Sequence, residues 1–357
     1  MKDAHGGNIW EAARKAGLSP GRIIDFSASI NPAGLGPRAK EAVRKALSII
    51  PAYPDPSGLE LKKALASYHG ISVGQVLPAN GSTELVFLIP QVLKPKKALI
   101  VEPAFSEYRR ALFIAGCRVK SLVLREKDGF LLEGARLKKA LSKGRVDVVY
   151  IGNPSNPTGA LVKKETLCDI AAFCEKAGTN LVVDEAFMDF CEAGSLKAEA
   201  SRFKNLLILR SMTKFFGMAG LRSGALVAHK SVIERFSRGI APWSVNTLAG
   251  AASIASLKDG HYIRKTRQWL QREKGFLLKG LCGVKGLKVF PSEANFFMFR
   301  IDGRMRASHL RARLLKKGIL IRDLTGFRGL GPGYCRVAVK ERKDNRALVE
   351  AINEVFS

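Results

Sequence analysis

A single lysine stands in an unusual sequence context. Residues 211–224 read SMTKFFGMAGLRSG, so Lys214 is surrounded by small and apolar residues, and Arg222 follows a short way downstream. The segment follows NLLILR (205–210), which has the apolar character of a buried strand. A lysine at the end of a core strand must either reach water or use its amine in chemistry. Lys214 is therefore a candidate reactive amine.

Other polar groups follow neighbouring apolar runs. VDVVYIG (146–152) leads into NPSNPTG (153–159), and NLVVDE (180–185) ends at Asp184 and Glu185. Taken singly, each has an ordinary explanation: a turn, a helix cap or a solvated lysine. In an open α/β sheet, however, ligands bind beyond the carboxyl ends of the strands. The series therefore predicts one site at that edge.

The elements that must position these groups alternate along the chain. Helix-period segments lie between several apolar runs, which predicts a mostly parallel sheet covered by helices. The expected strands are 98–102, 119–124, 146–152, 180–185, 205–209 and 224–229, and the expected helices are 107–115, 133–142 and 163–177. A helical stretch follows over 245–282, then strands near 287–290, 296–300, 319–322 and 334–339, and a final helix. We expect a three-layer α/β/α domain over 45–245 and a smaller α+β domain from 1–44 and 246–357.

Composition narrows the class of protein. The chain has 357 residues, of which 46% are hydrophobic, and it shows no signal-like or membrane-spanning run, so we expect a cytoplasmic protein with no membrane partner. Its six cysteines have no CxxC spacing, so neither a metal site nor a disulfide framework is expected. The net charge of +28 comes from dispersed residues, which favours a solvated basic surface that steers anionic substrates over a nucleic-acid partner.

NPSNPTG, DEAF (184–187) and SMTKFFGMAGLRSG in series resemble the fold-type I pyridoxal 5'-phosphate (PLP) enzymes, in particular the class I/II aminotransferase superfamily. The resemblance covers essentially the whole chain. It implies that Lys214 forms the Schiff base with PLP, for which burial and a nearby cation must lower its pKa. It implies that Asp184 pairs with the pyridine nitrogen and that Asn156 donates to the ring O3′.

The resemblance also implies a site for the cofactor phosphate. NGSTELVF (80–87) reads as a turn opening a helix, whose backbone amides at Ser82 and Thr83 would hold the phosphate. The remaining groups at this phosphate would be Ser211, Thr213 and Arg222.

Two aromatic residues receive roles in the same way. Phe105, in EPAFSEY, would stack on the cofactor ring, the alternative being a core aromatic. Tyr53, in AYPDPSG, resembles the tyrosine that reaches the phosphate of the neighbouring subunit, which implies a homodimer.

Three features point to a subfamily. The chain opens with HGGN (5–8), continues with DFSASINPAGLGP (25–37), and has Phe187 where many aminotransferases have a tyrosine that bonds O3′. This combination resembles the threonine-phosphate decarboxylases of cobalamin biosynthesis, with the histidinol-phosphate aminotransferases as the alternative. The implied reaction converts L-threonine O-3-phosphate to (R)-1-amino-2-propanol O-2-phosphate and CO₂.

Both candidate substrates are small phosphorylated amino compounds, so a second anion site is needed. Arg322 in LIRDLTGF and Arg336 in GYCRVAVK would bind the substrate's anionic groups, with His5 and Asn31 contributing. The alternative is that both are surface arginines of a very basic chain. A DNA-binding protein with an aminotransferase-like domain is a further alternative, but no residues are left over for a DNA-binding region.

Overall fold

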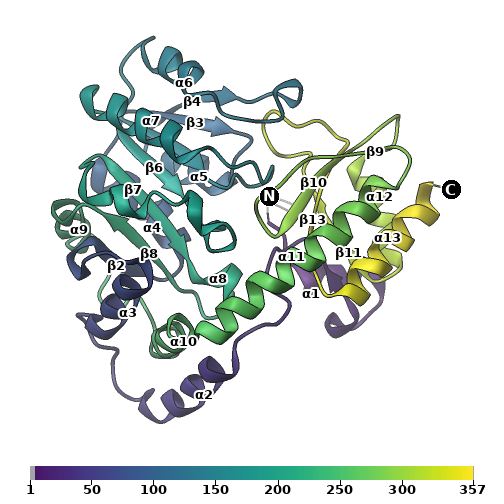
Figure 1. Ribbon diagram of the computed structural model, residues 1–357, viewed down its shortest axis with the longest axis horizontal. Coiled ribbons are helices and arrows are strands. Elements are labelled where there is room, and N and C mark those ends of the chain that lie inside the picture. Colours follow the sequence, from purple (N-terminus) through teal and green to yellow (C-terminus); the bar gives the residue numbers. More distant parts are fainter. Residues whose placement is uncertain (1–4, 357) are drawn as a thin grey trace.

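The computed structural model describes residues 5–356 and contains a large and a small α/β part (Figure 1). The larger sheet has seven strands in the order β2-β8-β7-β6-β5-β3-β4. β3 to β7 pair in parallel, and β8 is antiparallel to both β7 and β2. The strands are β2 (Val76–Ala79), β3 (Lys97–Glu102), β4 (Arg118–Val123), β5 (Val148–Gly152), β6 (Asn180–Asp184), β7 (Leu206–Ser211) and β8 (Gly224–Ala228).

Helices cover both faces of this sheet. Because successive strand residues point to opposite faces, Ile100 and Val182 belong to one core cluster while Val101 and Val183 belong to another. The first cluster includes residues of α4 (Ser82–Leu93), α5 (Ser106–Ile114) and α9 (Lys230–Ser237). The second includes residues of α6 (Gly134–Leu141) and α7 (Lys164–Lys176). The predicted three-layer α/β/α architecture with a mostly parallel sheet is confirmed.

The smaller part is built on a four-stranded antiparallel sheet in the order β12-β13-β10-β9. Its strands are β9 (Leu287–Val289), β10 (Phe296–Ile301), β12 (Arg322–Asp323) and β13 (Tyr334–Ala338). A separate parallel pair joins β1 (Ile24–Asp25) to β11 (Ile319–Leu320). The strand expected over 319–322 is therefore two strands in two sheets. The helices that pack here include α1 (Ile9–Ala16), α12 (Ala307–Lys316) and α13 (Arg342–Phe356).

The stretch expected to be helical over 245–282 is two helices, α10 (Thr247–Leu257) and α11 (Gly260–Cys282). The break falls at Asp259, whose side chain accepts a hydrogen bond of 3.1 Å from the backbone amide of Tyr262 and so caps α11. The edge strand β2 was not predicted. It is short and contains Pro78, which a sheet accommodates at an edge.

The lysine-bearing turn is α8 (Met212–Phe215), a single turn directly after β7. Its apolar residues Met212 and Phe215 pack in a cluster with α2 (Pro37–Ala46), α3 (Leu59–His69) and α10. The domain boundaries expected from the sequence stay a prediction. Within residues 5–356, no helix has both the length and the apolar character needed to span a bilayer.

Candidate active site

One cavity gathers the polar groups at the carboxyl edge of the large sheet. Asp184 ends β6, Gly152 ends β5 next to it in register, and Ser211 ends β7, so the parallel strands deliver all three to the same edge. Nine of the residues expected around the cofactor line this cavity: Ser82, Thr83, Phe105, Asn156, Asp184, Ser211, Thr213, Lys214 and Arg222. Phe187 also lines it and packs edge-on against Phe296, with ring centroids 5.0 Å apart.

The amine of Lys214 is set up to react. Burial lowers the pKa of the Lys214 ammonium to about 8 from its ordinary 10.5, and the positive charges of Arg336 and Arg222 act in the same direction while Asp184 opposes them. At pH 7 a pKa near 8 leaves about a tenth of the amine unprotonated, against about one part in three thousand at the ordinary value. The cavity therefore contains a usable nucleophile.

Asp184 faces the cavity as a buried carboxyl group with two donors. Its side chain is 8% exposed, Oδ1 accepts from the backbone amide of Ala186 at 2.9 Å, and Oδ2 accepts from the hydroxyl of Tyr108. Burial raises the pKa of Asp184, and the two hydrogen bonds and the charge of Lys214 oppose that rise. A carboxylate has about four lone-pair positions, so Asp184 can still accept a hydrogen bond from a protonated ring nitrogen.

An anion cradle lies at the start of α4. Gly81, with φ of +77°, precedes the helix, and a Cβ there would lie 2.7 Å from Nη2 of Arg222. Glycine therefore lets the guanidinium approach the helix start, where the first backbone amides have no partner within the helix. The hydroxyls of Ser211 and Thr213, 2.7 Å apart, complete the lining. Free amides at a helix N-terminus beside an arginine suit a phosphate group.

A buried arginine lies behind the cavity lining, where it bonds Asn156. Arg336 is 7% exposed, donates from Nη2 to the carbonyl of Ser27 at 2.8 Å and from Nη1 to Oδ1 of Asn156, and lies over the ring of Phe296 at 4.9 Å. Burial lowers the pKa of Arg336 to about 9, and the charge of Arg322 contributes to the shift. Two buried guanidiniums whose charges act on each other favour the binding of an anion here.

A larger cleft of about 820 Å³ adjoins the cofactor cavity, and Phe105 lines both. His5 and Arg322, both expected at the substrate, lie in its wall. His5 Nε2 lies 3.1 Å from Glu107 Oε1, and its ring centroid lies 5.9 Å from that of Phe105. Further guanidiniums line this cleft, from Arg109, Arg110, Arg311 and Arg328. The cleft is a basic approach to the cavity.

The HGGN segment is held against Ser27. A Cβ at Gly6 would fall 2.2 Å from the carbonyl oxygen of Ser27, so only glycine fits there, and the amide of Gly7 donates to the Ser27 hydroxyl at 2.8 Å. The same carbonyl accepts from Arg336. The two glycines thus bring His5 to the cleft beside the buried arginines.

Asn31 does not line either cavity, and its expected contact with substrate is not supported by the geometry. Its side-chain amide lies 2.9 Å from the carbonyl of Phe215, 3.0 Å from the hydroxyl of Tyr262 and 3.1 Å from that of Thr266. Its backbone amide donates to the carbonyl of Lys214 at 3.0 Å. Asn31 therefore fixes the lysine-bearing turn, with its amide already fully used inside the protein.

Tyr53 lies outside the cofactor cavity of its own chain. Its side chain is 80% exposed and stacks on Trp243, with ring centroids 4.6 Å apart. Its expected role at the phosphate of a second subunit stays a prediction.

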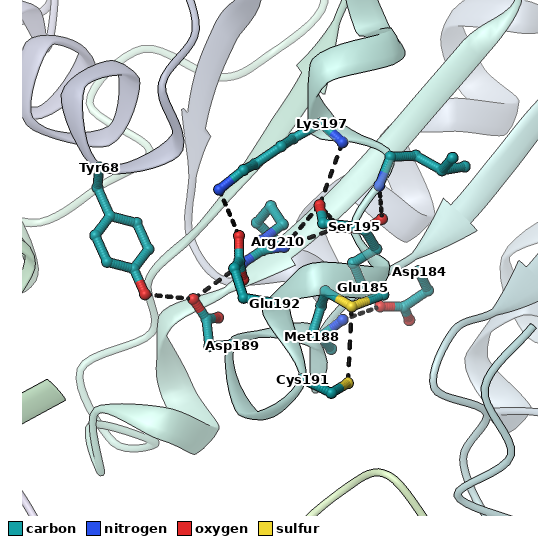
Figure 2. Close-up of polar contacts among 12 residues, drawn as sticks. Tyr68, Asp184, Glu185, Met188, Asp189, Cys191, Glu192, Ser195, Lys197 and Arg210 are labelled. Carbon is teal, nitrogen blue, oxygen red and sulfur yellow. Dashed lines mark hydrogen bonds and ion pairs between the residues drawn. The ribbon is translucent and has the colours of Figure 1, made fainter. Parts of the chain in front are cut away.

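Behind Asp184 lies a buried ionic network, the Arg210 cluster (Figure 2). Arg210 is 2% exposed, and its guanidinium bonds Glu185 Oε2 at 2.8 Å, Asp189 Oδ1 at 2.9 Å and Glu192 Oε2 at 2.8 Å. The outer members of the cluster are Tyr68, Ser195 and Lys197. Because Glu185 follows Asp184 and Arg210 precedes Ser211, the cluster ties together the two strand ends that carry cavity residues.

Tyr108 and the Arg210 cluster were not predicted. Tyr108 lies in the quoted EPAFSEY motif, three residues after Phe105, and a polar aromatic one helical turn from a cavity residue was a usable signal. Arg210 ends the apolar NLLILR run, and a charge in that position signalled buried partners. The sequence alone did not identify those partners.

The fold and the lysine-centred cavity define an enzyme that uses PLP, since the cradle, the amine and the acceptor carboxylate suit the cofactor's phosphate, aldehyde and ring nitrogen. The chain belongs to the aminotransferase class I and II family, whose sequence pattern matches residues 22–352.

Individual relatives include both candidate subfamilies. Threonine-phosphate decarboxylase of Salmonella typhimurium strain LT2 is 39% identical over 360 aligned residues, covering 100% of this chain and 98% of the relative. The crystal structure of histidinol-phosphate aminotransferase from Clostridium acetobutylicum has a TM-score of 0.87 and 29% identity, covering 92% of this chain and 98% of that one. The PLP complex of histidinol-phosphate aminotransferase from Sinorhizobium meliloti shares the fold, with a TM-score of 0.87, 22% identity and coverage of 98% and 95%.

Proposed function

We propose that this enzyme decarboxylates L-threonine O-3-phosphate to (R)-1-amino-2-propanol O-2-phosphate and CO₂ in cobalamin biosynthesis. The observation that carries the proposal is the 39% identity to the Salmonella typhimurium threonine-phosphate decarboxylase along the whole chain. Phe187 in the cavity, in place of a hydroxyl-bearing tyrosine, agrees with a subfamily whose task is not transamination.

The cofactor, when bound, supplies an electron-withdrawing ring that accepts the electrons of a broken bond at the substrate Cα. Lys214 holds the cofactor through its amine and moves a proton at that carbon, Asp184 keeps the ring nitrogen protonated, and Asn156 contacts the ring oxygen. Phe105 packs on the ring. The start of α4, with Ser82 and Thr83, holds the cofactor phosphate together with Ser211, Thr213 and Arg222.

The substrate brings a phosphate and a carboxylate, and the chain offers buried positive charge for them. Arg336 and Arg322 are 7% and 8% exposed, and His5 lies in the adjoining cleft. Which bond breaks depends on how these groups hold the substrate. When the arginines bind the substrate phosphate, the substrate carboxylate is left without a stabilising cation. Loss of CO₂ then disperses the negative charge of that carboxylate.

The second candidate is histidinol-phosphate aminotransferase, favoured by the likeness to the Clostridium acetobutylicum structure. Its substrate also carries a phosphate, and both reactions use the same lysine. Among the described residues that line the cavity, only Phe187 bears on the choice between them.

The deciding experiment compares the two reactions in the PLP-loaded enzyme. We expect ¹⁴CO₂ from carboxyl-labelled threonine phosphate and none from threonine, the unphosphorylated control. Conversion of histidinol phosphate and 2-oxoglutarate to glutamate, without CO₂ from threonine phosphate, would establish the aminotransferase instead.

We also propose a cytoplasmic homodimer. Exposed apolar side chains precede Tyr53 in the sequence: Leu47 (53% exposed), Ile49 (56%) and Ile50 (52%). Tyr53 itself stacks on the exposed Trp243. A second copy covering this surface would bring Tyr53 to the neighbouring cofactor phosphate.

A further inference from the structure

We propose that Tyr108 is a positioning residue that orients Asp184 and sets how the proton is shared between Asp184 and the ring nitrogen of bound PLP. Its phenol donates directly to the carboxylate that faces the cavity. The inference depends on the cofactor and not on whether the enzyme is a decarboxylase or an aminotransferase, so the failure of one proposal does not touch the other.

The geometry fixes the carboxylate at both oxygens. Tyr108 donates to Oδ2 of Asp184, and the backbone amide of Ala186 donates to Oδ1 at 2.9 Å. Two donors on different oxygens define the plane of the group and leave lone pairs for a third donor. Because a backbone amide is common to any residue at position 186, Tyr108 is the side chain that sets the orientation.

The phenol also controls the charge of Asp184. Burial raises the pKa of this carboxyl, and the hydrogen bond from Tyr108 is the largest effect opposing the rise, ahead of the Ala186 amide and the charge of Lys214. Burial and the charge of Asp184 hold the pKa of Tyr108 well above its ordinary 10, with smaller contributions from Tyr150 and Glu102. Tyr108 therefore stays protonated and remains a donor. Without it, Asp184 binds the shared proton more tightly, and the ring nitrogen loses it.

Tyr108 is held in place by aromatic contacts. Its ring lies edge-on to Phe105, with centroids 5.7 Å apart and planes at 82°, and 5.3 Å from the ring of Tyr150. Phe105, the residue expected on the cofactor ring, thus directly precedes α5, and the donor to Asp184 lies in the first turn of that helix.

Tyr150 provides a matched control. It is 1% exposed, adjoins Tyr108, and its hydroxyl has no hydrogen-bond partner among the described residues. Tyr150→Phe removes the same atom from a similarly buried ring without touching Asp184.

The experiment loads wild type, Tyr108→Phe and Tyr150→Phe with PLP labelled with ¹⁵N in the ring. We expect Tyr108→Phe to move the ¹⁵N resonance towards the unprotonated ring and to weaken PLP binding about tenfold or more, the size expected for a hydrogen bond to a charged group. Tyr150→Phe should change neither the resonance nor the dissociation constant. Urea unfolding of the apoproteins reports any general loss of stability.

An unchanged resonance in folded Tyr108→Phe would overturn the proposal, as would equal shifts in both variants. If Tyr108→Phe does not fold, wild type labelled with ¹³C at the tyrosine ζ carbons gives a second test. Labelled Tyr150→Phe removes the signal of the neighbouring ring, and among the remaining signals that do not titrate below pH 10 one must still move when PLP binds. If PLP binding moves only the signals of tyrosines that titrate below pH 10, the proposal is wrong.

Discussion

Replacing Arg210 with methionine tests the Arg210 cluster. Methionine occupies a comparable volume but leaves Glu185, Asp189 and Glu192 facing one another without the guanidinium that lies within 2.9 Å of each. Because the side chains of Glu185 and Asp189 are almost fully buried, water has little access to the two carboxylates. Removing one partner of a buried ion pair costs about 3–5 kcal/mol, which is a large part of the roughly 5–15 kcal/mol that stabilises a typical domain.

The loss should also depend on pH. Without the cation, the pKa values of Glu185 and Asp189 in the folded variant rise further above their values in the unfolded chain. Such a group destabilises the fold as pH rises through its unfolded pKa, about 4, so the deficit is full near pH 7 and shrinks as pH falls towards 4. In the wild type, burial already raises the pKa of Asp189 and of Glu185.

Urea unfolding of the apoprotein at pH 7.5 and pH 5, followed by tryptophan fluorescence, measures both effects. Arg202→Met is the control, because the Arg202 side chain is 69% exposed and lies 3.8 Å from Glu199, so its removal should change stability by less than about 0.5 kcal/mol. A deficit below about 1 kcal/mol for Arg210→Met, or one that grows on acidification, would refute the reasoning.

Three further outcomes are expected. The rate at which PLP attaches to the apoprotein, followed by stopped-flow absorbance, should rise with pH around a midpoint near 8, the pKa of Lys214; Arg336→Gln should raise that midpoint, because it removes a cation that lowers this pKa, and an unchanged midpoint would contradict the assignment. Arg336→Gln should also raise KM for the phosphorylated substrate more than about tenfold, while the dissociation constant for PLP changes less than about threefold; equal losses would place Arg336 at the cofactor instead. Trp243→Glu, which puts a charge on the surface beside Tyr53, should yield monomers in analytical ultracentrifugation at concentrations where wild type is dimeric, and a persistent dimer would show that the interface lies elsewhere.

The strand ends were predictable because their chemistry is local. Apolar runs of five to seven residues identify β5, β6 and β7, and the shared edge of parallel strands then places Asp184, Asn156 and Lys214 together without any knowledge of side-chain contacts. The specific motifs at those ends identify the cofactor by resemblance.

The rest depends on contacts between distant segments. The side-chain amide of Asn31 is bonded to groups 184 to 235 residues away in the sequence, so nothing local distinguishes its structural role from a substrate contact. Tyr108 could be read as another core aromatic until Asp184 is found at its hydroxyl. The break between α10 and α11 depends on Asp259 capping the second helix. This cap is a local signal, but the helical periodicity on both sides of it hides the break in the sequence.

The long helix α11 starts beside α10 and ends beside the smaller sheet (Figure 1). Its carboxyl-terminal half contributes Leu277 and Leu281 to the core of the smaller sheet, while Tyr262 and Thr266 near its start bond Asn31, which in turn bonds the carbonyl of Lys214. At 1.5 Å per residue, its 23 residues form a strut of about 34 Å. A displacement of the smaller sheet along this helix would therefore be transmitted through Asn31 to the turn that carries the reactive amine.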